Sequence, residues 1–216
     1  MPGAANDMKK ILIYALLLLV ALAWWQSRSL GSIPVIALPP DAPSVFSPAL
    51  SLAGPPIQQS IDGSAFPLTA GDFELRPQAL FQVEARVLGR KDYRRGTEAL
   101  LSPMDLALGW GRMADPDVLD SIRIRQSGRF YSWRVDEFPI PRREIEQSSA
   151  NMHLIPANEE IGRQLKAIGK NDQVRLAGFL VHVDRADGWR WRTSLTRNDT
   201  GAGACEIVLV TRVESI

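Results

Sequence analysis

The 216-residue chain has a single cysteine, Cys205, and only two histidines, His153 and His182. One cysteine cannot form an internal disulfide, so packing must stabilise the fold. Two separated histidines and one cysteine lack the spacing of a zinc site, and no metal or other cofactor is expected. Nor is there a surplus of charge, because 25 Lys and Arg residues accompany 24 Asp and Glu residues. Binding to phosphate backbones needs clustered cations, so a nucleic-acid partner is not expected.

Residues 1–25 contain a long apolar run, Ile11 to Trp25, directly after Lys9 and Lys10. Its length lies between that of a signal-peptide core and the roughly 20 residues of an upright transmembrane helix. Ala21-Leu22-Ala23 has the small-x-small form of a cleavage site, so a cleaved secreted form is one alternative. The pair Trp24-Trp25 suits the headgroup layer and favours a retained single-pass anchor. The two lysines predict a cytoplasmic amino terminus, with the body of the protein outside the membrane.

Residues 26–67 are rich in proline, serine and alanine and contain no repeat. Proline removes backbone donors and fixes φ, which predicts an extended linker. A proline-rich docking segment is the alternative, but no regular PxxP array supports it. Residues 68–216 then have the length of one ordinary domain.

This domain has a mostly β pattern. Residues 81–87 alternate apolar and polar side chains, which predicts a strand that buries Phe81, Val83, Ala85 and Val87. Two strands on either side of Ser127-Gly128 form an expected hairpin. Further strands are expected at residues 173–184, 189–194 and 207–213, with a bend at Gly178.

Helices are predicted from capping residues. Asn158 begins a helix over Glu159–Ile168, with glutamates at its amino end and Gly169 after it. Short helices are expected after Ser102-Pro103, Asp115-Pro116 and Pro141. The fold class is therefore α+β and mostly β: a small coiled sheet or partly open barrel of oligonucleotide/oligosaccharide-binding (OB) type, after an N-terminal transmembrane helix.

Cys205 lies in a glycine-rich segment, residues 197–206, between two predicted strands. A catalytic thiol needs a base, for which His153 or His182 is available, and Asp199 is a candidate to orient the ring. The alternatives are a packing residue, because Cys205 adjoins an apolar strand, and an intermolecular disulfide. Both histidines also suit structural roles within apolar segments.

The aromatic residues suggest a second kind of site. Trp189 and Trp191 share one strand face, with Arg190 and Arg192 on the other. Such residues can line a groove for a glycan or peptide, or they can supply buried area to a small core. The groove would also include Trp110, Trp133, Phe130 and Tyr131.

Four segments carry a resemblance to a group of bacterial proteins that share the order of anchor, linker and domain. They are residues 106–111, 126–130, 149–156 and 197–206, with the sequences LALGWG, QSGRF, SANMHLIP and RNDTGAGACE. The resemblance covers most of the domain and implies a bacterial source and an inner-membrane or periplasmic setting. It implies no activity, cofactor or catalytic residue.

The sequence therefore predicts a membrane-anchored envelope protein whose domain binds or scaffolds a protein, peptide or glycan partner. A thiol-dependent hydrolase or transferase that uses Cys205 is the alternative. A third hypothesis is a subunit of an envelope complex whose anchor makes specific contacts.

Overall fold

The computed structural model describes residues 14–16, 35–40, 42, 45–62, 66–197 and 204–216. They belong to two units, Met1–Ile33 and Pro34–Ile216. In the first unit residues 14–16 are helical, and the rest of the predicted anchor lies outside the described residues. Within the described ranges, no helix is both long enough and apolar enough to cross a membrane. The elements discussed below belong to the second unit.

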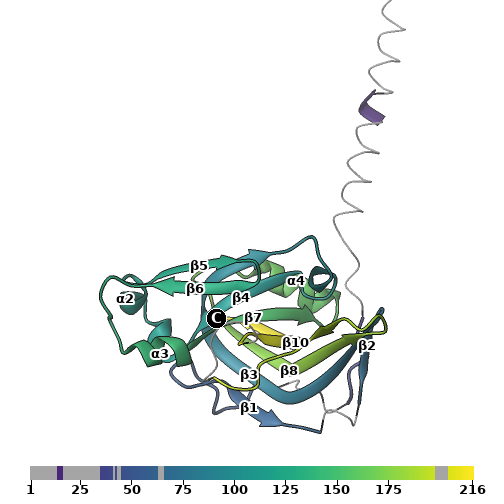
Figure 1. The fold of residues 1–216 in the computed structure, drawn as a ribbon, viewed down its shortest axis with the longest axis horizontal. Helices are drawn as coiled ribbons and strands as arrows, with labels where there is room; N and C mark the ends of the chain where they lie inside the picture. The colour runs from purple at the N-terminus through teal and green to yellow at the C-terminus, as the bar shows by residue number, and fades with distance from the viewer. Residues whose placement is uncertain (1–13, 17–34, 41, 43–44, 63–65, 198–203) are drawn as a thin grey trace, which may run out of the picture. The chain divides into compact units, whose positions relative to one another are not determined.

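The second unit is mostly β with few helices, as the sequence predicts (Figure 1). The strands are β1 (Ile57–Ser60), β2 (Leu68–Ala70), β3 (Phe73–Asp92), β4 (Met104–Gly109), β5 (Arg123–Ser127), β6 (Phe130–Arg134), β7 (Ser149–Pro156), β8 (Gln173–Arg185), β9 (Arg190–Trp191) and β10 (Glu206–Ser215). The helices are α2 (Pro116–Leu119), α3 (Arg142–Gln147) and α4 (Glu159–Ala167), with 3-10 turns at Glu98–Leu100 and Gly111–Ala114.

Strand pairing closes a ring of five strands. β3 pairs with β4 and with β8, β4 with β7, β7 with β10, and β10 with β8. The β7–β10 pair is parallel, and the other four pairs are antiparallel. Register shifts after Pro77 and after Val87 allow the 20-residue β3 to curve around the ring.

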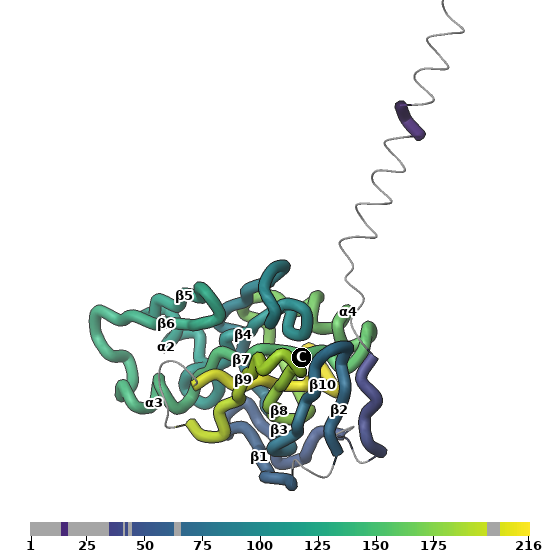
Figure 2. Tube along the Cα trace, turned by 45° about the vertical axis from the view of Figure 1, so that its right-hand side comes forward, coloured from purple at the N-terminus to yellow at the C-terminus, as the bar shows by residue number. Residues whose placement is uncertain are grey.

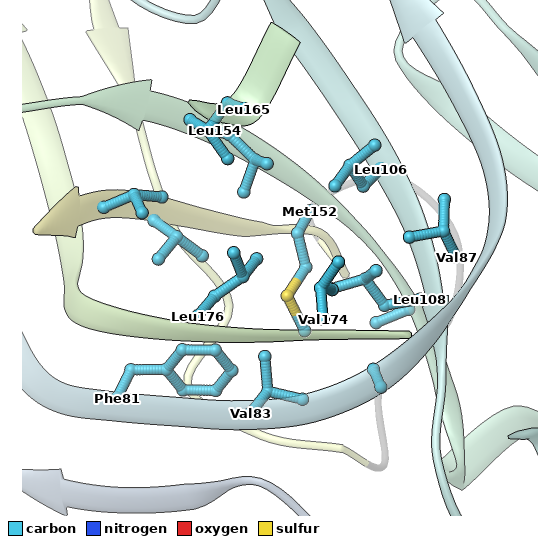
Figure 3. Packing of buried hydrophobic residues seen from close by; sticks show 14 of the residues in the cluster. Phe81, Val83, Val87, Leu106, Leu108, Met152, Leu154, Leu165, Val174 and Leu176 are labelled. Carbon is cyan, nitrogen blue, oxygen red and sulfur yellow. The ribbon is translucent and has the colours of Figure 1, made fainter. Parts of the chain in front are cut away.

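The interior of the ring is apolar (Figure 3). The predicted alternation in β3 is confirmed, because Phe81, Val83, Ala85 and Val87 are all fully buried. They pack with residues of β7 and β8 such as Met152 and Leu176. The helix α4 is also confirmed: the Asn158 side chain caps it by accepting from the Ile161 N–H at 3.0 Å. Its buried face adds Ile161 and Leu165 to the same cluster.

The β5–β6 hairpin forms a separate two-stranded sheet near α2 and α3, at one side of the ring (Figure 2). Its two-residue turn is Gly128-Arg129, one residue later than the predicted Ser127-Gly128, with φ values of 56° and 67°. Positive φ at both positions is typical of a type I′ turn, which matches the twist of a hairpin. The hairpin packs over a cluster that includes Leu88, Met113 and Ile145, with Tyr131 and Trp133 partly buried against it.

Two local expectations were wrong. A strand, β4, follows Ser102-Pro103 in place of the predicted helix, because residues 104–109 pair on both sides, with β3 and with β7. The strand expected over residues 189–194 is limited to Arg190–Trp191, which pairs only with β8 in the described part of the chain.

The described part of residues 26–67 differs from the extended linker expected. Ile36 is 4% exposed and its N–H donates to the Ala157 carbonyl at 3.0 Å. Leu50 is also buried, and β1 pairs with β3. The folded unit therefore begins near Pro34 and not at Leu68, because apolar side chains between the prolines pack on the ring.

Candidate functional site

Polar residues interrupt two otherwise apolar strands of the ring. Every residue of β4 and β7 is buried, yet β4 contains Asp105 and β7 contains Asn151 and His153. Asp105 lies directly opposite His153, and Ala107 lies opposite Asn151. Because side chains alternate along a strand, these polar residues share the face that is turned away from the interior.

Arg129, in the hairpin turn, covers this face. Its Nη1 donates to Asp105 Oδ1 at 2.9 Å, and its Nη2 donates to the Ser102 carbonyl at 2.8 Å. The side chain of Arg129 is 14% exposed, and that of Asp105 is 0% exposed. The guanidinium carbon lies 4.0 Å from the ring centre of Tyr93 and 5.3 Å from that of Trp191. A buried ion pair between two aromatic rings therefore fastens the hairpin to the ring.

The same carboxylate contacts two side chains of β7. His153 Nδ1 lies 2.9 Å from Asp105 Oδ1, although it is not aligned for a hydrogen bond. The His153 ring is 4.8 Å from that of Trp191. Asn151 Nδ2 donates to Asp105 Oδ2 at 3.3 Å and to the Arg129 carbonyl at 3.1 Å. We call Asp105, Arg129, Asn151 and His153 the Asp105 network.

A cavity of about 540 Å³ lies beside this network, between the hairpin and the ring. Asn151 belongs to both, and Cys205 lines the cavity with its Sγ 3.9 Å from the Arg129 carbonyl oxygen. The lining includes exposed aromatic side chains, since Phe130 and Phe138 are 51% and 54% exposed. Its full lining is residues 130–135, Phe138, Arg142, Glu146, residues 149–151, Thr196, Arg197 and residues 204–206. We call this cavity the β6 pocket.

Paired charges and hydroxyl groups form the walls of the β6 pocket. The buried Glu206 carboxylate accepts a hydrogen bond from Arg197, and Arg142 Nε donates to Glu146 Oε1 at 2.9 Å. The hydroxyls of Tyr131 and Ser149 are hydrogen-bonded to each other. Burial raises the pKa of Tyr131 to about 12, and the charges of Glu206 and Cys205 act in the same direction. Tyr131 is therefore a neutral hydroxyl at physiological pH.

Tyr93 is held neutral in a similar way at the Asp105 network. Its hydroxyl accepts a hydrogen bond from the Arg129 N–H at 3.0 Å. Burial, followed by the negative charge of Asp105, raises the Tyr93 pKa to about 12. Tyr93 is therefore a neutral hydroxyl close to the Asp105–Arg129 ion pair.

The predicted catalytic residues do not form one site in the described part of the chain. Cys205 lies in the β6 pocket and His153 in the Asp105 network, while Asp199 lies outside the described residues. His182 is on β8, where its Nδ1 accepts from the Thr193 N–H at 3.3 Å. Burial, together with the charges of Arg192 and Arg76, lowers the His182 pKa. His182 therefore has a structural role, because its ring accepts a hydrogen bond from the backbone.

Residues 189–192, which were predicted to line a groove, do not line the β6 pocket, although Trp191 contacts Arg129 and His153 of the Asp105 network. Trp189 and Trp191 are half-buried, with ring centres 6.1 Å apart, and pack on a core cluster. Arg192 and Arg190 face Asp184, at 2.6 Å and 3.9 Å. Burial alone would raise the Asp184 pKa, but these arginines and Arg76 outweigh it and lower the value.

Of the other aromatic residues in that expected groove, Phe130, Tyr131 and Trp133 line the β6 pocket. Trp110 is buried in the interior cluster.

Sequence reasoning missed Asp105, Asn151, Arg129 and Tyr93. A signal was present for the first two, because a lone Asp or Asn within an apolar strand must find partners when buried. No sequence signal pairs Arg129 with them. Among the described residues, no group of three or more His, Cys, Asp or Glu side chains could hold a metal ion.

No protein-family model, curated protein or solved structure matches this chain.

Proposed function

We propose that the chain is a single-pass protein of the bacterial inner membrane, whose periplasmic domain binds a partner in the β6 pocket. The apolar run after Lys9 and Lys10 supports the anchor, and the lack of acidic residues within it supports insertion. A C-terminal reporter enzyme that is active only in the periplasm should be active when fused to the full chain. Activity of a cytoplasm-only reporter would contradict this orientation.

We further propose that the ring is a barrel of OB type. In chain order the five strands of the ring are β3, β4, β7, β8 and β10. The first strand, β3, pairs with the second, β4, and with the fourth, β8. The third strand, β7, pairs with the fifth, β10. Barrels of this type bind ligands on the face of the second and third strands and between neighbouring loops. Those strands are β4 and β7, and the face of β4 and β7 that is turned outward carries the Asp105 network. Fold type alone does not identify a ligand, so the ligand is inferred from the residues of the pocket.

The observation that carries the binding function is the β6 pocket itself. Its volume of about 540 Å³ falls within the roughly 300–1,000 Å³ of small ligand sites. Phe130 and Phe138 are more than half exposed there, which is costly for large apolar side chains unless a partner covers them. Several polar groups of its lining are hydrogen-bonded within the protein, Tyr131 with Ser149, Arg197 with Glu206, and Asn151 with Gln126, as in a preformed site.

Phe138→Ala tests this function against a matched control. We expect the full-length protein in detergent micelles to bind at least one of two probes, chitotriose or the blocked peptide acetyl-Val-Glu-Val-Glu-Val-Glu-amide. Phe138→Ala should weaken that binding by about threefold to tenfold, because an exposed aromatic contact is lost. The control Leu100→Ala removes a side chain that is 67% exposed outside the pocket. Equal effects of the two changes on affinity, measured by NMR titration, would contradict binding in the pocket.

A thiol-dependent hydrolase or transferase is the second candidate. One observation favours it: Cys205 lines the pocket beside a network that contains a histidine next to a carboxylate. Alkylation of Cys205 should then be fast, with a midpoint well below the pH of about 8.5 of a free thiol. Cys205→Ser provides the blank. Labelling only after denaturation would exclude this candidate.

A further inference from the structure

The strand β6 has one open edge. Within the described residues it pairs only with β5, in a two-stranded sheet. An unpaired strand edge presents a row of N–H and C=O groups that can pair with another chain. Natural proteins usually cover or charge such an edge, so its surroundings indicate what it is for.

The hairpin register identifies which main-chain groups face the open edge. Ser127 and Phe130 flank a two-residue turn, which makes them a hydrogen-bonded pair. Ser132 and Arg134, at two-residue intervals, also direct their main-chain groups toward β5. The N–H and C=O groups of Tyr131 and Trp133 therefore point away from β5, toward the open edge.

The β6 pocket runs along this edge. Six consecutive residues, 130–135, line it. Successive side chains of a strand point to opposite faces, so a cavity on one face would contact only every second residue. Contact with all six indicates a cavity that follows the edge, where another strand would lie.

The charges of the pocket favour an acidic occupant. Glu206 is paired with Arg197, and Glu146 is paired with Arg142. The remaining cation, Arg134, is exposed and forms no ion pair with any described residue. Trp133, on the opposite face of β6, packs edge-on against Phe138 with ring centres 6.2 Å apart.

We propose that the β6 pocket binds an extended peptide, which adds to the hairpin as a third strand through the main-chain groups of Tyr131 and Trp133. Strand addition of this kind takes its affinity from the main chain and its specificity from alternate side chains. The peptide residue opposite Trp133 is apolar and the one opposite Arg134 is acidic, because directly opposed side chains lie within contact distance. This inference rests on the proposed binding function and names the class of partner.

The peptide acetyl-Val-Glu-Val-Glu-Val-Glu-amide has this alternation and tests the inference by NMR with the full-length protein in micelles. We expect the peptide to shift the amide signals of Tyr131 and Trp133 and to slow their hydrogen exchange. N-methylation of one alternate set of peptide amides should abolish binding, and methylation of the other set should preserve it. Such a difference arises only when one edge of the peptide pairs with a strand.

Charge reversal at the rim provides a second readout. Arg134→Glu should weaken binding of this peptide about fivefold and strengthen binding of its Val-Lys counterpart, as expected for one exposed ion pair. Arg125→Glu is the matched control, because Arg125 is an exposed arginine on β5 that does not line the pocket. Equal responses to the two substitutions would overturn the acidic specificity.

The outcomes separate this inference from the function on which it rests. If chitotriose shifts pocket signals while the peptide leaves the Tyr131 and Trp133 amides unprotected, strand addition fails and the binding function stands. If neither probe shifts any pocket signal at millimolar concentration, strand addition fails and the binding function fails with it.

Discussion

Asp105 is a charged residue of the site whose side chain is completely buried. Its carboxylate is fully buried and faces Arg129, His153 and Asn151. Removing one partner of a buried ion pair leaves an uncompensated charge, which typically costs more than the pair itself contributes. Asp105 therefore connects the ring to the hairpin that forms one wall of the β6 pocket.

Asp105→Asn should lower the free energy of unfolding by roughly 3–5 kcal/mol, because the buried Arg129 guanidinium loses its counter-charge. Urea denaturation of the full-length protein measures this. The double variant Asp105→Asn with Arg129→Gln should recover part of the loss, because neither charge is then buried alone. If Asp105→Asn alone lowered the free energy of unfolding by less than about 1 kcal/mol, water would be solvating the Arg129 guanidinium in place of the carboxylate.

Tyr93 and Tyr131 should make stability fall at high pH. Burial raises the pKa of each to about 12 in the folded protein, against about 10 in an unfolded chain. Between these values the unfolded state has released its protons while the folded state retains them, so stability decreases as pH rises from about 10 to 12. Absorbance at alkaline pH should show that Tyr93 and Tyr131 ionise late. Tyr131→Phe should remove one late step, and an unchanged titration would contradict the assignment.

At the scale of elements, local patterns predicted some parts of the fold well and others poorly. Alternation identified the centre of β3, and capping identified α4. The sequence analysis did not identify β4 or β7, because both strands are buried on both faces and so have no solvent-facing row of polar residues to mark them. In β4, the preceding Ser-Pro pair also imitates a helix start. Pro77 conceals the full length of β3, since it lies at a register shift that only the paired strand reveals.

Gly178 was predicted to mark a bend, and the structure gives a more specific reason for a glycine there. A Cβ at this position would lie 1.9 Å from the Leu209 carbonyl oxygen of β10. The contact is with backbone, beside the register shift between Val210 and Arg212, so it cannot be relieved by rotating a side chain. The close approach of β8 and β10 helps to close the ring.

Gly178→Ala should therefore destabilise the protein by roughly 2–4 kcal/mol, because the two strands must separate. Thermal and urea unfolding measure the loss. Gly169→Ala is the matched control, since its nearest contact would be an ordinary 3.6 Å to Asp172. Equal stability of the two variants would show that β10 shifts without cost.

At the scale of the whole molecule, the sequence predicted a mostly β domain but not its boundary or its site. The Asp105 network joins residues from β4, the hairpin turn and β7. Along the chain, Arg129 lies 24 positions and Asn151 lies 46 positions after Asp105. No local pattern encodes such contacts, because they depend on which strands become neighbours in the ring. The boundary was missed for a related reason: the proline-rich composition of residues 26–67 conceals the few apolar side chains that pack on the domain.

A chain that begins at Leu68 should consequently be less stable than one that begins at Pro34. It lacks β1, which pairs with β3, and the hydrogen bond from the Gly111 N–H to the Leu52 carbonyl at 2.8 Å. It also loses Ile36 and Leu50, and burying one such side chain contributes about 1.5–3 kcal/mol. We expect the free energy of unfolding to fall by at least roughly 3 kcal/mol. Urea denaturation of the two truncated chains and of the full-length protein provides the measurement.

Point substitutions in the full-length protein distinguish the loss of specific side-chain packing from the effect of shortening the chain. Ile36→Ala should cost roughly 2–5 kcal/mol, because the side chain is 4% exposed within a core cluster. Its neighbour Val35 is 76% exposed, so Val35→Ala should change stability by no more than about 0.5 kcal/mol. If Ile36→Ala were as mild as Val35→Ala, the segment before β1 would contribute little to the fold, and Leu68 would stand as the functional boundary. A large difference between these adjacent positions instead makes the segment before β1 part of the domain that forms the β6 pocket.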